Sequence, residues 1–322
     1  MAQRILETGQ IETLAERSIP RIRLPDRECV FARRAARLRE LAPSAALGDY
    51  LQFLAVLVEA QHAVLAQLPL GSRAPEHAAR SSDHAMPPID AALWLRAQEW
   101  RATLLTLCAA LAARPGFPTA VGDGIATIRG ATPDWIEAQA RALLAAPDAA
   151  VDAQIAPLVM AALQVHAVAL AAGFVAAEVK ALDIPGVCPL CGTLPVASIV
   201  CAQSPYQGYR YLHCALCATE WHMVRVQCSQ CGASGKNIGY HCLARKTLNQ
   251  NRSEEGGTAV RAESCDQCRG YRKIMYQEKD PSVEPVADDV ASVALDLLLG
   301  EEGYHRLSNN PLLWLPDAQR AS

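Results

Sequence analysis

The sequence runs Cys188-Pro-Leu-Cys191-Gly192 and then repeats the C-x-x-C spacing three more times, at Cys214/Cys217, Cys228/Cys231 and Cys265/Cys268. Two residues between cysteines allow one tight turn to present both sulfurs to the same ion, and two such turns complete a tetrahedral site. Four pairs in one region therefore predict two four-cysteine metal sites of the zinc-ribbon or rubredoxin type.

The loops between the pairs indicate how the pairs combine. The first two pairs are separated by 22 residues and the last two by 33. Because short loops cost the least entropy to close, we expect the first pair to join the second and the third to join the fourth. Pairing the first with the fourth and the second with the third is the main alternative. The spacing does not separate zinc from iron, since four thiolates in a tetrahedron suit both metals.

The residue after each pair bears on the turn geometry. Gly192 and Gly232 follow two of the pairs, and glycine tolerates the positive φ that turns a backbone N–H toward a sulfur. Ala218 and Arg269 follow the other two, so those turns must be built differently or under strain. Between the pairs, short β-branched and aromatic runs predict strands and hence small antiparallel ribbons; they are Pro195–Val200, Tyr209–His213 and Glu220–Val226.

The first half of the chain shows apolar residues at three- and four-residue spacing, which is typical of amphipathic helices. The expected helices are Arg27–Ala42, Gly48–Leu68, Asp90–Arg114, Thr132–Ala146 and Asp152–Leu182. Loops rich in Pro, Gly and Ser separate them, at Pro69–Pro88 and Pro115–Gly130. After Asp280-Pro281 the helical pattern returns, with Asp288-Asp289 expected in a favourable first turn and Gly300 at the end, followed by a tail containing Trp314.

Composition changes sharply at Asp183-Ile184-Pro185-Gly186, and ten of the twelve cysteines follow between Cys188 and Cys268. We therefore expect a multidomain α plus small β protein: an Ala-rich N-terminal helical bundle (1–182), two metal knuckle modules (183–227 and 228–280) and a C-terminal helix with a tail (281–322). The uncharged stretch from Ala153 to Ala177 contains Gln, Pro and His and is mostly Ala, so we expect a bundle helix rather than a membrane span.

Several function classes are disfavoured. The first residues show no secretion signal, so we expect a cytoplasmic protein, where thiols stay reduced and paired cysteines indicate metal rather than disulfides. Residues 186–280 carry 11 Lys/Arg and 7 Asp/Glu, a surplus that eight thiolates with two divalent ions would cancel, which disfavours nucleic-acid binding. The sequence has no phosphate-binding glycine loop, nucleophile elbow or His-Glu-x-x-His motif, so no enzyme activity is expected.

The remaining cysteines and histidines have plainer interpretations. With eight cysteines available as ligands, none of the nearby histidines is required, and the unpaired cysteines are expected to be small buried side chains. The residues concerned are Cys29, Cys108, Cys201, Cys242, His213, His222 and His241.

Long strings of the sequence resemble the formate dehydrogenase accessory protein family, FdhE. They are Cys188-Pro-Leu-Cys-Gly, Gly208-Tyr-Arg-Tyr-Leu-His-Cys-Ala-Leu-Cys-Ala-Thr-Glu-Trp-His, Val260-Arg-Ala-Glu-Ser-Cys-Asp-Gln-Cys-Arg-Gly-Tyr, Tyr276-Gln-Glu-Lys-Asp-Pro-Ser-Val-Glu-Pro-Val-Ala-Asp-Asp and Asn310-Pro-Leu-Leu. The resemblance runs from about Pro25 to Leu313 and is looser in the helical half.

This resemblance implies a cytoplasmic factor that is needed for active formate dehydrogenase and that acts on the molybdopterin-containing catalytic subunit before its export. It also implies rubredoxin-like iron binding by the eight paired cysteines, with zinc as the alternative metal. The oligomeric state is left open.

Two short strings are our candidate surface for the partner, because Trp and Arg often anchor interfaces. They contain Trp221 and His222, and Tyr271, Arg272 and Lys273, although Trp221 suits a place beneath a ribbon equally well. Two rival functions are a redox protein that passes electrons through iron, and a zinc-ribbon protein that binds nucleic acid.

Overall fold

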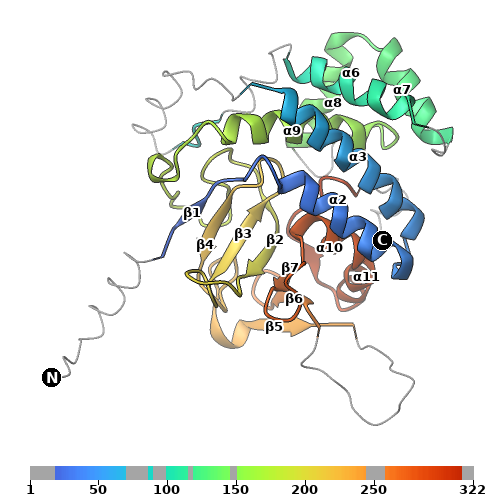
Figure 1. The fold of residues 1–322 in the computed structure, drawn as a ribbon. Coiled ribbons are helices and arrows are strands. Elements are labelled where there is room, and N and C mark those ends of the chain that lie inside the picture. The colour runs from blue at the N-terminus through green and yellow to red at the C-terminus, as the bar shows by residue number, and fades with distance from the viewer. Residues whose placement is uncertain are drawn as a thin grey trace, which may run out of the picture.

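The computed structural model describes residues 19–69, 86–89, 99–114, 119–145, 151–243 and 258–313. A layer of helices lies over one side of a mixed β-sheet, and two C-terminal helices pack beside the sheet (Figure 1). The predicted class, an α plus small β protein with a helical bundle and cysteine knuckles, is confirmed. None of the described helices has the length and hydropathy that crossing a membrane requires.

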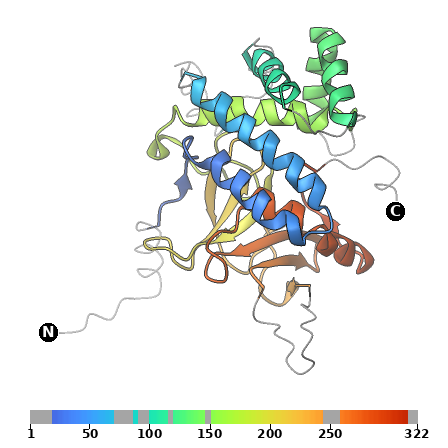
Figure 2. The ribbon, with the colours of Figure 1, turned by 45° about the vertical axis from the view of Figure 1, so that its right-hand side comes forward.

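The helical layer contains six of the described α-helices. They are α2 (Val30–Leu41), α3 (Gly48–Gln67), α6 (Glu99–Ala112), α7 (Thr119–Gly130), α8 (Pro133–Ala145) and α9 (Ala156–Ala171). Short 3-10 turns occupy Ala42–Ser44, Ala176–Glu178 and Gly235–Asn237. Helices α2 and α3 run side by side across the front of the molecule (Figure 2).

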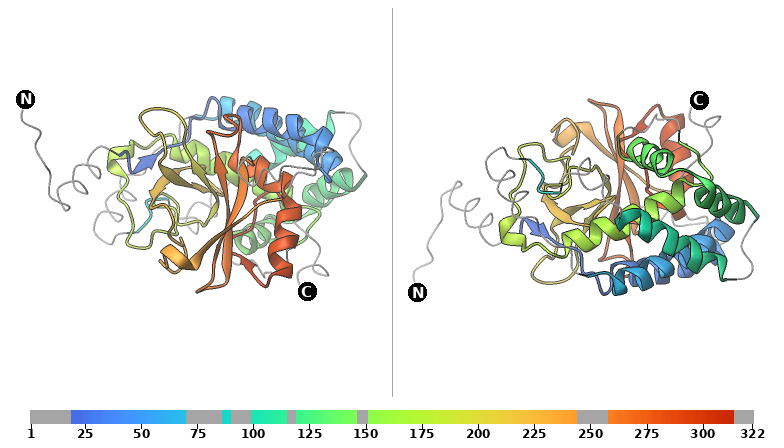
Figure 3. Two further views of the ribbon diagram at one scale, coloured as in Figure 1. Left: turned by 90° about the horizontal axis from the view of Figure 1, so that it is seen from below. Right: turned by 90° about the horizontal axis from the view of Figure 1, so that it is seen from above.

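Helix α9 lies at the centre of this layer, where it contacts α3, α6 and α8 (Figure 3). It is apolar on all sides, and 14 of its 16 residues are buried. A helix without a polar face is stable only where it is surrounded, so α9 is the core of the bundle. It is shorter than the predicted Asp152–Leu182 helix and stops just before Gly173, a poor helix former.

The interpretation of Pro115–Gly130 as a loop was wrong, because α7 occupies most of it. Gly122 and Gly124 lower the helix propensity, but Ile125 and Ile128 are buried against the bundle and outweigh that cost. Gly124 has a packing role, since a Cβ there would lie 3.1 Å from the carbonyl oxygen of Gln154.

The strands form one eight-stranded sheet rather than separate ribbons. They are β1 (Ile22–Arg23), β2 (Pro195–Val200), β3 (Arg210–Cys214), β4 (Glu220–Met223), β5 (Ile238–His241), β6 (Val260–Cys265), β7 (Gly270–Tyr276) and β8 (His305–Arg306). The order is β1-β4-β3-β2-β7-β6-β5, with β8 paired to β7. Pairing is antiparallel within each module as predicted, but a parallel β2–β7 pair, with Ser198 opposite Ile274, joins the two modules.

The C-terminal helical segment is divided into α10 (Pro285–Ala291) and α11 (Val293–Glu301). The break occurs at Ser292, whose backbone leaves the helical conformation (φ −103°, ψ 32°) and whose hydroxyl donates to the Asp288 carbonyl at 2.6 Å. Asp288 and Asp289 are buried rather than solvent-facing: Asp288 pairs with Arg37 of α2 at 2.7 Å, and Asp289 pairs with Lys273 of β7 at 3.5 Å. They connect the C-terminal helices to the bundle and the sheet. Trp314 lies outside the described residues.

Candidate metal centres

The first group of cysteines comes from the turn before β2 and the turn between β3 and β4. Cys188, Cys191, Cys214 and Cys217 bring their sulfurs within 4.8 Å of one another. The Cys188 and Cys217 sulfurs are 3.7 Å apart, and the Cys191 and Cys214 sulfurs are 3.4 Å apart. All four residues are buried.

The second group comes from the turn after β4 and the turn between β6 and β7. Cys228, Cys231, Cys265 and Cys268 also lie with their sulfurs within 4.8 Å of one another. The sulfur distances are 3.7 Å for Cys228 and Cys268 and 3.6 Å for Cys231 and Cys265. The sequential pairing predicted from loop length is therefore the one that the structure has.

Both groups have the dimensions of a four-thiolate metal site. Sulfurs about 2.3 Å from a central ion lie about 3.8 Å apart along the edges of a tetrahedron. The observed separations of 3.4–3.7 Å are close to this value and far longer than a disulfide bond. Each group can hold one metal ion, and its four ligands leave no position for a reacting water.

All four turns share one backbone conformation. The residue after the second cysteine has a positive φ in every case: 74° at Gly192 and Gly232, and 57° at Ala218 and Arg269. The glycines adopt this conformation freely, whereas Ala218 and Arg269 adopt it under strain. The two turns without a following glycine are therefore built in the same way as the others, at a cost in strain. This conformation belongs to a turn in which backbone N–H groups approach sulfur, as Cys217 N does to Cys214 Sγ at 3.4 Å.

Threonine hydroxyls accompany only the first group. Thr193 and Thr219 each lie two residues after the second cysteine of a pair, and their hydroxyl oxygens are 3.5 Å from Cys191 Sγ and 3.2 Å from Cys217 Sγ. The corresponding positions of the second group are Ala233 and Gly270. The threonines can donate hydrogen bonds to thiolates. The C-x-x-C spacing alone did not indicate this contribution.

The helical bundle holds the first group in place. The side-chain amide of Gln164, on α9, donates to the carbonyl of Ala215, which lies between Cys214 and Cys217, at 2.9 Å. Gln61 of α3 donates in turn to the Gln164 side chain at 3.1 Å. Ile89 N donates to the Leu190 carbonyl in the other turn at 2.9 Å. Both turns of the first group are thus fixed by the helical half of the chain.

Acidity differs between cysteines of one group in the same way at both sites. Burial raises the pKa of Cys188 and Cys214, whereas hydrogen bonds from neighbouring thiols lower the pKa of Cys191. In the second group, a backbone hydrogen bond from Ala233 lowers the pKa of Cys231. Burial raises the pKa of Cys228, so in the first turn of each group the second cysteine is more acidic than the first.

The other cysteines and the nearby histidines take no part in either group. Cys108 and Cys201 are buried, and Arg23 donates to the Cys201 sulfur at 3.1 Å. His213 Nδ1 lies 3.1 Å from Glu220, and His241 Nδ1 lies 3.2 Å from Glu302. Cys29 and Cys242 are half-buried, and His222 lies edge-on to Tyr209 and Tyr211.

Most of the residues that we selected as a partner surface lie inside the protein. Trp221 is 5% exposed, and its indole N–H donates to the Pro185 carbonyl at 2.7 Å, beneath the ribbon. Tyr271, Arg272 and Lys273, on β7, are at most 3% exposed. His222 is half-buried. A role for these residues in partner binding stays a prediction, and the buried four have structural contacts of their own.

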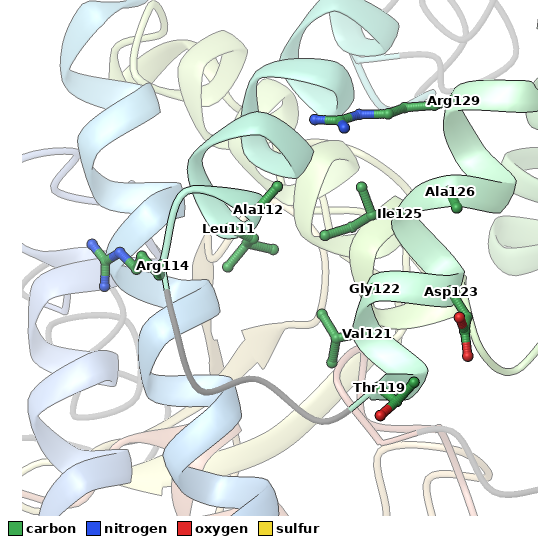
Figure 4. Close-up of a pocket in the computed structure, with 10 residues that line it drawn as sticks. All are labelled: Leu111, Ala112, Arg114, Thr119, Val121, Gly122, Asp123, Ile125, Ala126 and Arg129. Atoms are coloured by element: carbon green, nitrogen blue, oxygen red, sulfur yellow. The ribbon is translucent and has the colours of Figure 1, made fainter.

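A separate groove lies in the helical layer, between the end of α6 and α7. It has a volume of about 700 Å³. Leu111, Val121 and Ile125 point toward one another across it, and Arg129 reaches from α7 toward α6 (Figure 4). It contains none of the paired cysteines.

A helical layer over a sheet, with four two-cysteine turns that form two four-cysteine groups, defines a class of protein with two candidate metal knuckles. Three sequence models of one family match consecutive parts of the chain: FdhE, N-terminal (19–183), FdhE, central domain (187–225) and FdhE, C-terminal domain (226–313). The chain therefore belongs to the FdhE family, and the resemblance seen in the sequence is confirmed.

Individual relatives agree with the family match. Protein FdhE of Escherichia coli (strain K12) is 39% identical over 313 residues, which are 96% of each chain. The protein FdhE homolog of Cronobacter sakazakii is 39% identical over 323 residues, 98% of each chain. The crystal structure of the FdhE protein from Pseudomonas aeruginosa superposes with a TM-score of 0.81 at 37% identity, covering 91% of this chain and 99% of that one.

Proposed function

We propose that this protein is an accessory factor for formate dehydrogenase, which binds the molybdopterin-containing catalytic subunit in the cytoplasm before export and has no enzyme activity of its own. Membership of the FdhE family supports the accessory role. The observation that carries the molecular part is the assembly of eight cysteines into two tetrahedral groups within one sheet.

We propose further that Cys188, Cys191, Cys214 and Cys217 hold one metal ion and Cys228, Cys231, Cys265 and Cys268 hold another. Thiolates suit iron and zinc, and we favour iron on the family resemblance. Bound metal would stabilise the turns, and iron would add a one-electron couple. We also propose a division into 1–182, 183–227, 228–280 and 281–322; the family ranges support its first two boundaries, because they change near residues 183–187 and 225–226.

The metal proposal is tested on protein purified without added metal, by elemental analysis and a visible spectrum before and after dithionite. Two irons per chain, with a thiolate-to-iron band that dithionite bleaches, would support iron as the bound metal. Two zincs without colour would support purely structural sites, and fewer than one ion per chain, with the eight thiols free to react, would contradict both.

The partner proposal needs a separate experiment. The tagged full-length chain should retain the catalytic subunit of formate dehydrogenase from an extract in which that subunit carries its export signal. A chain with Cys231→Ser is the matched variant, because this cysteine is exposed and its loss should leave the bundle folded. Failure of the folded wild-type chain to retain the subunit would contradict the proposal.

Electron transfer is the second candidate, and the exposure of Cys231 favours it. A metal ion in the second group would lie next to solvent and to any docked protein, as a surface redox site requires. Reversible reduction of bound iron that depends on the partner would support this function. For the nucleic-acid alternative, we expect no salt-sensitive retention on DNA or RNA at low ionic strength.

A further inference from the structure

Arg272, in the middle of β7, is a buried cation whose hydrogen-bond acceptors are all neutral. Its side chain is 3% exposed, and it donates to Ser229 Oγ at 3.2 Å, to Ser308 Oγ at 2.7 Å and to the Pro195 carbonyl. None of these oxygens carries a charge. Burial, together with repulsion from Arg210 and Arg306, lowers the pKa of Arg272 to about 9. Burying an unpaired charge is costly, so a compensating anion is expected nearby.

The other buried cations in the described part of the chain have carboxylate partners. Salt bridges of 2.6–2.9 Å connect Arg34 to Glu284, Arg37 to Asp288, Arg210 to Glu263 and Lys273 to Asp296. Among the residues that the structure describes, no carboxylate lies within ion-pair distance of Arg272. Glu263 lies opposite Arg272 but is paired with Arg210, so one carboxylate serves two guanidinium groups. The charge of Arg272 is therefore not neutralised by a salt bridge.

The second cysteine group lies where the missing anion is needed. Ser229, which accepts from Arg272, directly follows Cys228 in the chain. Arg272, Cys228 and Cys265 line the same enclosed space, together with Glu263, whose carboxylate is paired with Arg210. Four thiolates around a divalent or trivalent ion carry a net negative charge, whereas four protonated thiols carry none.

Arg272 also reaches the first group. Another of its three acceptors, Pro195, lies opposite Cys214 in the β2–β3 pair. The two modules touch here, because a Cβ on Gly186, just before Cys188, would lie only 2.2 Å from the Ser229 carbonyl oxygen. Arg272 is thus a side chain that connects the turn of one group to the strand that carries the other, as Arg210 of β3 also does through the Gln227 carbonyl.

We propose that Arg272 is the buried counter-cation of the metal-thiolate group formed by Cys228, Cys231, Cys265 and Cys268, and that it couples metal binding there to the packing of the two modules. The inference rests on the proposed metal binding. In metal-free protein no described residue forms a salt bridge with Arg272, because Glu263, which lies opposite it, is paired with Arg210; metal binding would create a second anionic group nearby. Part of the affinity of the second group therefore comes from Arg272, a positioning residue that does not touch the ion.

The test uses the full chain, metal-free and reduced, titrated with Co²⁺ in competition with a chelator, with the cobalt–thiolate absorption as the readout. Arg272→Gln removes the charge but keeps a donor for Pro195, and should weaken Co²⁺ binding at the second group about tenfold or more. Arg272→Lys keeps the charge and should retain most of the affinity. A Cys231→Ser background identifies the signal of the first group, which should change little.

Lys273→Met is the matched control, because Lys273 is the next residue of β7, is equally buried and is paired with carboxylates. It should lower the melting temperature without changing Co²⁺ affinity. If Arg272→Gln does not fold, Ser229→Ala removes the contact between Arg272 and the turn, and should weaken the second group about threefold.

The possible results distinguish the role of Arg272 from metal binding itself. Two cobalt ions per wild-type chain, with one bound much more weakly in Arg272→Gln, supports the inference. Equal affinity in wild type, Arg272→Gln and Ser229→Ala overturns it and leaves Arg272 a purely structural residue, while the metal sites stand. Absence of cobalt–thiolate absorption in the folded wild-type chain overturns the metal sites themselves.

Discussion

The two cysteine groups use the same turns and differ in what surrounds them. All four cysteines of the first group are at most 6% exposed. Gln164 of the bundle contacts one of its turns, and Ile89 contacts the other. The first group thus lies at the contact between the helical layer and the sheet, where the core of the protein is formed.

The second group lies at the surface. Cys231 is exposed and Cys268 is half-buried. Its outer turn is held by Arg269, which stacks over the Tyr304 ring at 3.9 Å and donates to the Glu302 carbonyl at 2.7 Å. Identical spacing therefore yields one group that acts as part of the core and one that solvent and partners can reach.

The two groups should differ most when the equivalent cysteine is removed from each. Cys191→Ser should abolish metal binding inside the core and lower the free energy of unfolding by about 5 kcal/mol or more, because metal-binding energy at a structural site is folding energy. Cys231→Ser should lose one ion and leave the bundle folded. Elemental analysis and thermal unfolding followed by circular dichroism measure both effects. Equal destabilisation by the two variants would contradict the distinction.

Metal removal should proceed in two phases. With Co²⁺ in both groups, a chelator should extract the ion of the second group at least about tenfold faster, because only local opening is needed there. Extraction from the first group should follow unfolding of its contact with α9. The decay of the cobalt–thiolate absorption gives both rates, and Cys231→Ser should lack the fast phase. A single phase in the wild-type chain would argue against the expected difference.

Two glutamines offer a smaller, matched comparison. Gln164 donates to Ala215 in a turn of the first group, and Gln227 donates to Gly232 in a turn of the second at 3.2 Å. Gln164→Leu leaves a buried carbonyl without a donor and should cost about 1–3 kcal/mol in urea denaturation. Gln227→Leu, at an exposed contact, should cost less than about 0.5 kcal/mol. A similar loss of unfolding free energy in the two variants would show that the contact of Gln164 with the first group stabilises the protein no more than the exposed contact of Gln227 does.

The smallest expected effect concerns the strained turn residues. Ala218→Gly should stabilise the metal-loaded protein by about 0.5 kcal/mol, because relief of the left-handed conformation exceeds the added chain entropy. Arg269→Gly relieves the same strain but loses the contacts with Tyr304 and Glu302, so no gain is expected. Urea midpoints at constant slope decide this. Destabilisation by Ala218→Gly would mean that its methyl packing outweighs the strain.

Much of this architecture could be predicted from local patterns. Cysteine spacing predicted the two groups and their pairing, and periodicity predicted α3 within one residue at its end and β2 over Pro195–Val200. Turn chemistry also indicated that the turns at Ala218 and Arg269 are built differently or under strain, and the structure shows the strained alternative. These features depend on residues close together in the chain.

The features that could not be predicted depend on contacts between distant residues. Helix α7 forms despite two glycines because Ile125 and Ile128 find a buried surface. Lys273 and Arg272 looked like surface residues, yet each has partners in other elements that no local pattern shows. The threonine hydroxyls beside the first group belong to the same category, since their effect depends on where the turn places them.

The parallel pairing of β2 with β7 bears on how the chain is made. During synthesis from the N-terminus, β2 and both turns of the first group leave the ribosome well before β7 does. Until then one edge of β2 has no partner, and an unpaired edge invites association with other chains. The last strands of the protein thus complete the first metal module, and a chain truncated before Gly270 should expose that edge however well its bundle folds.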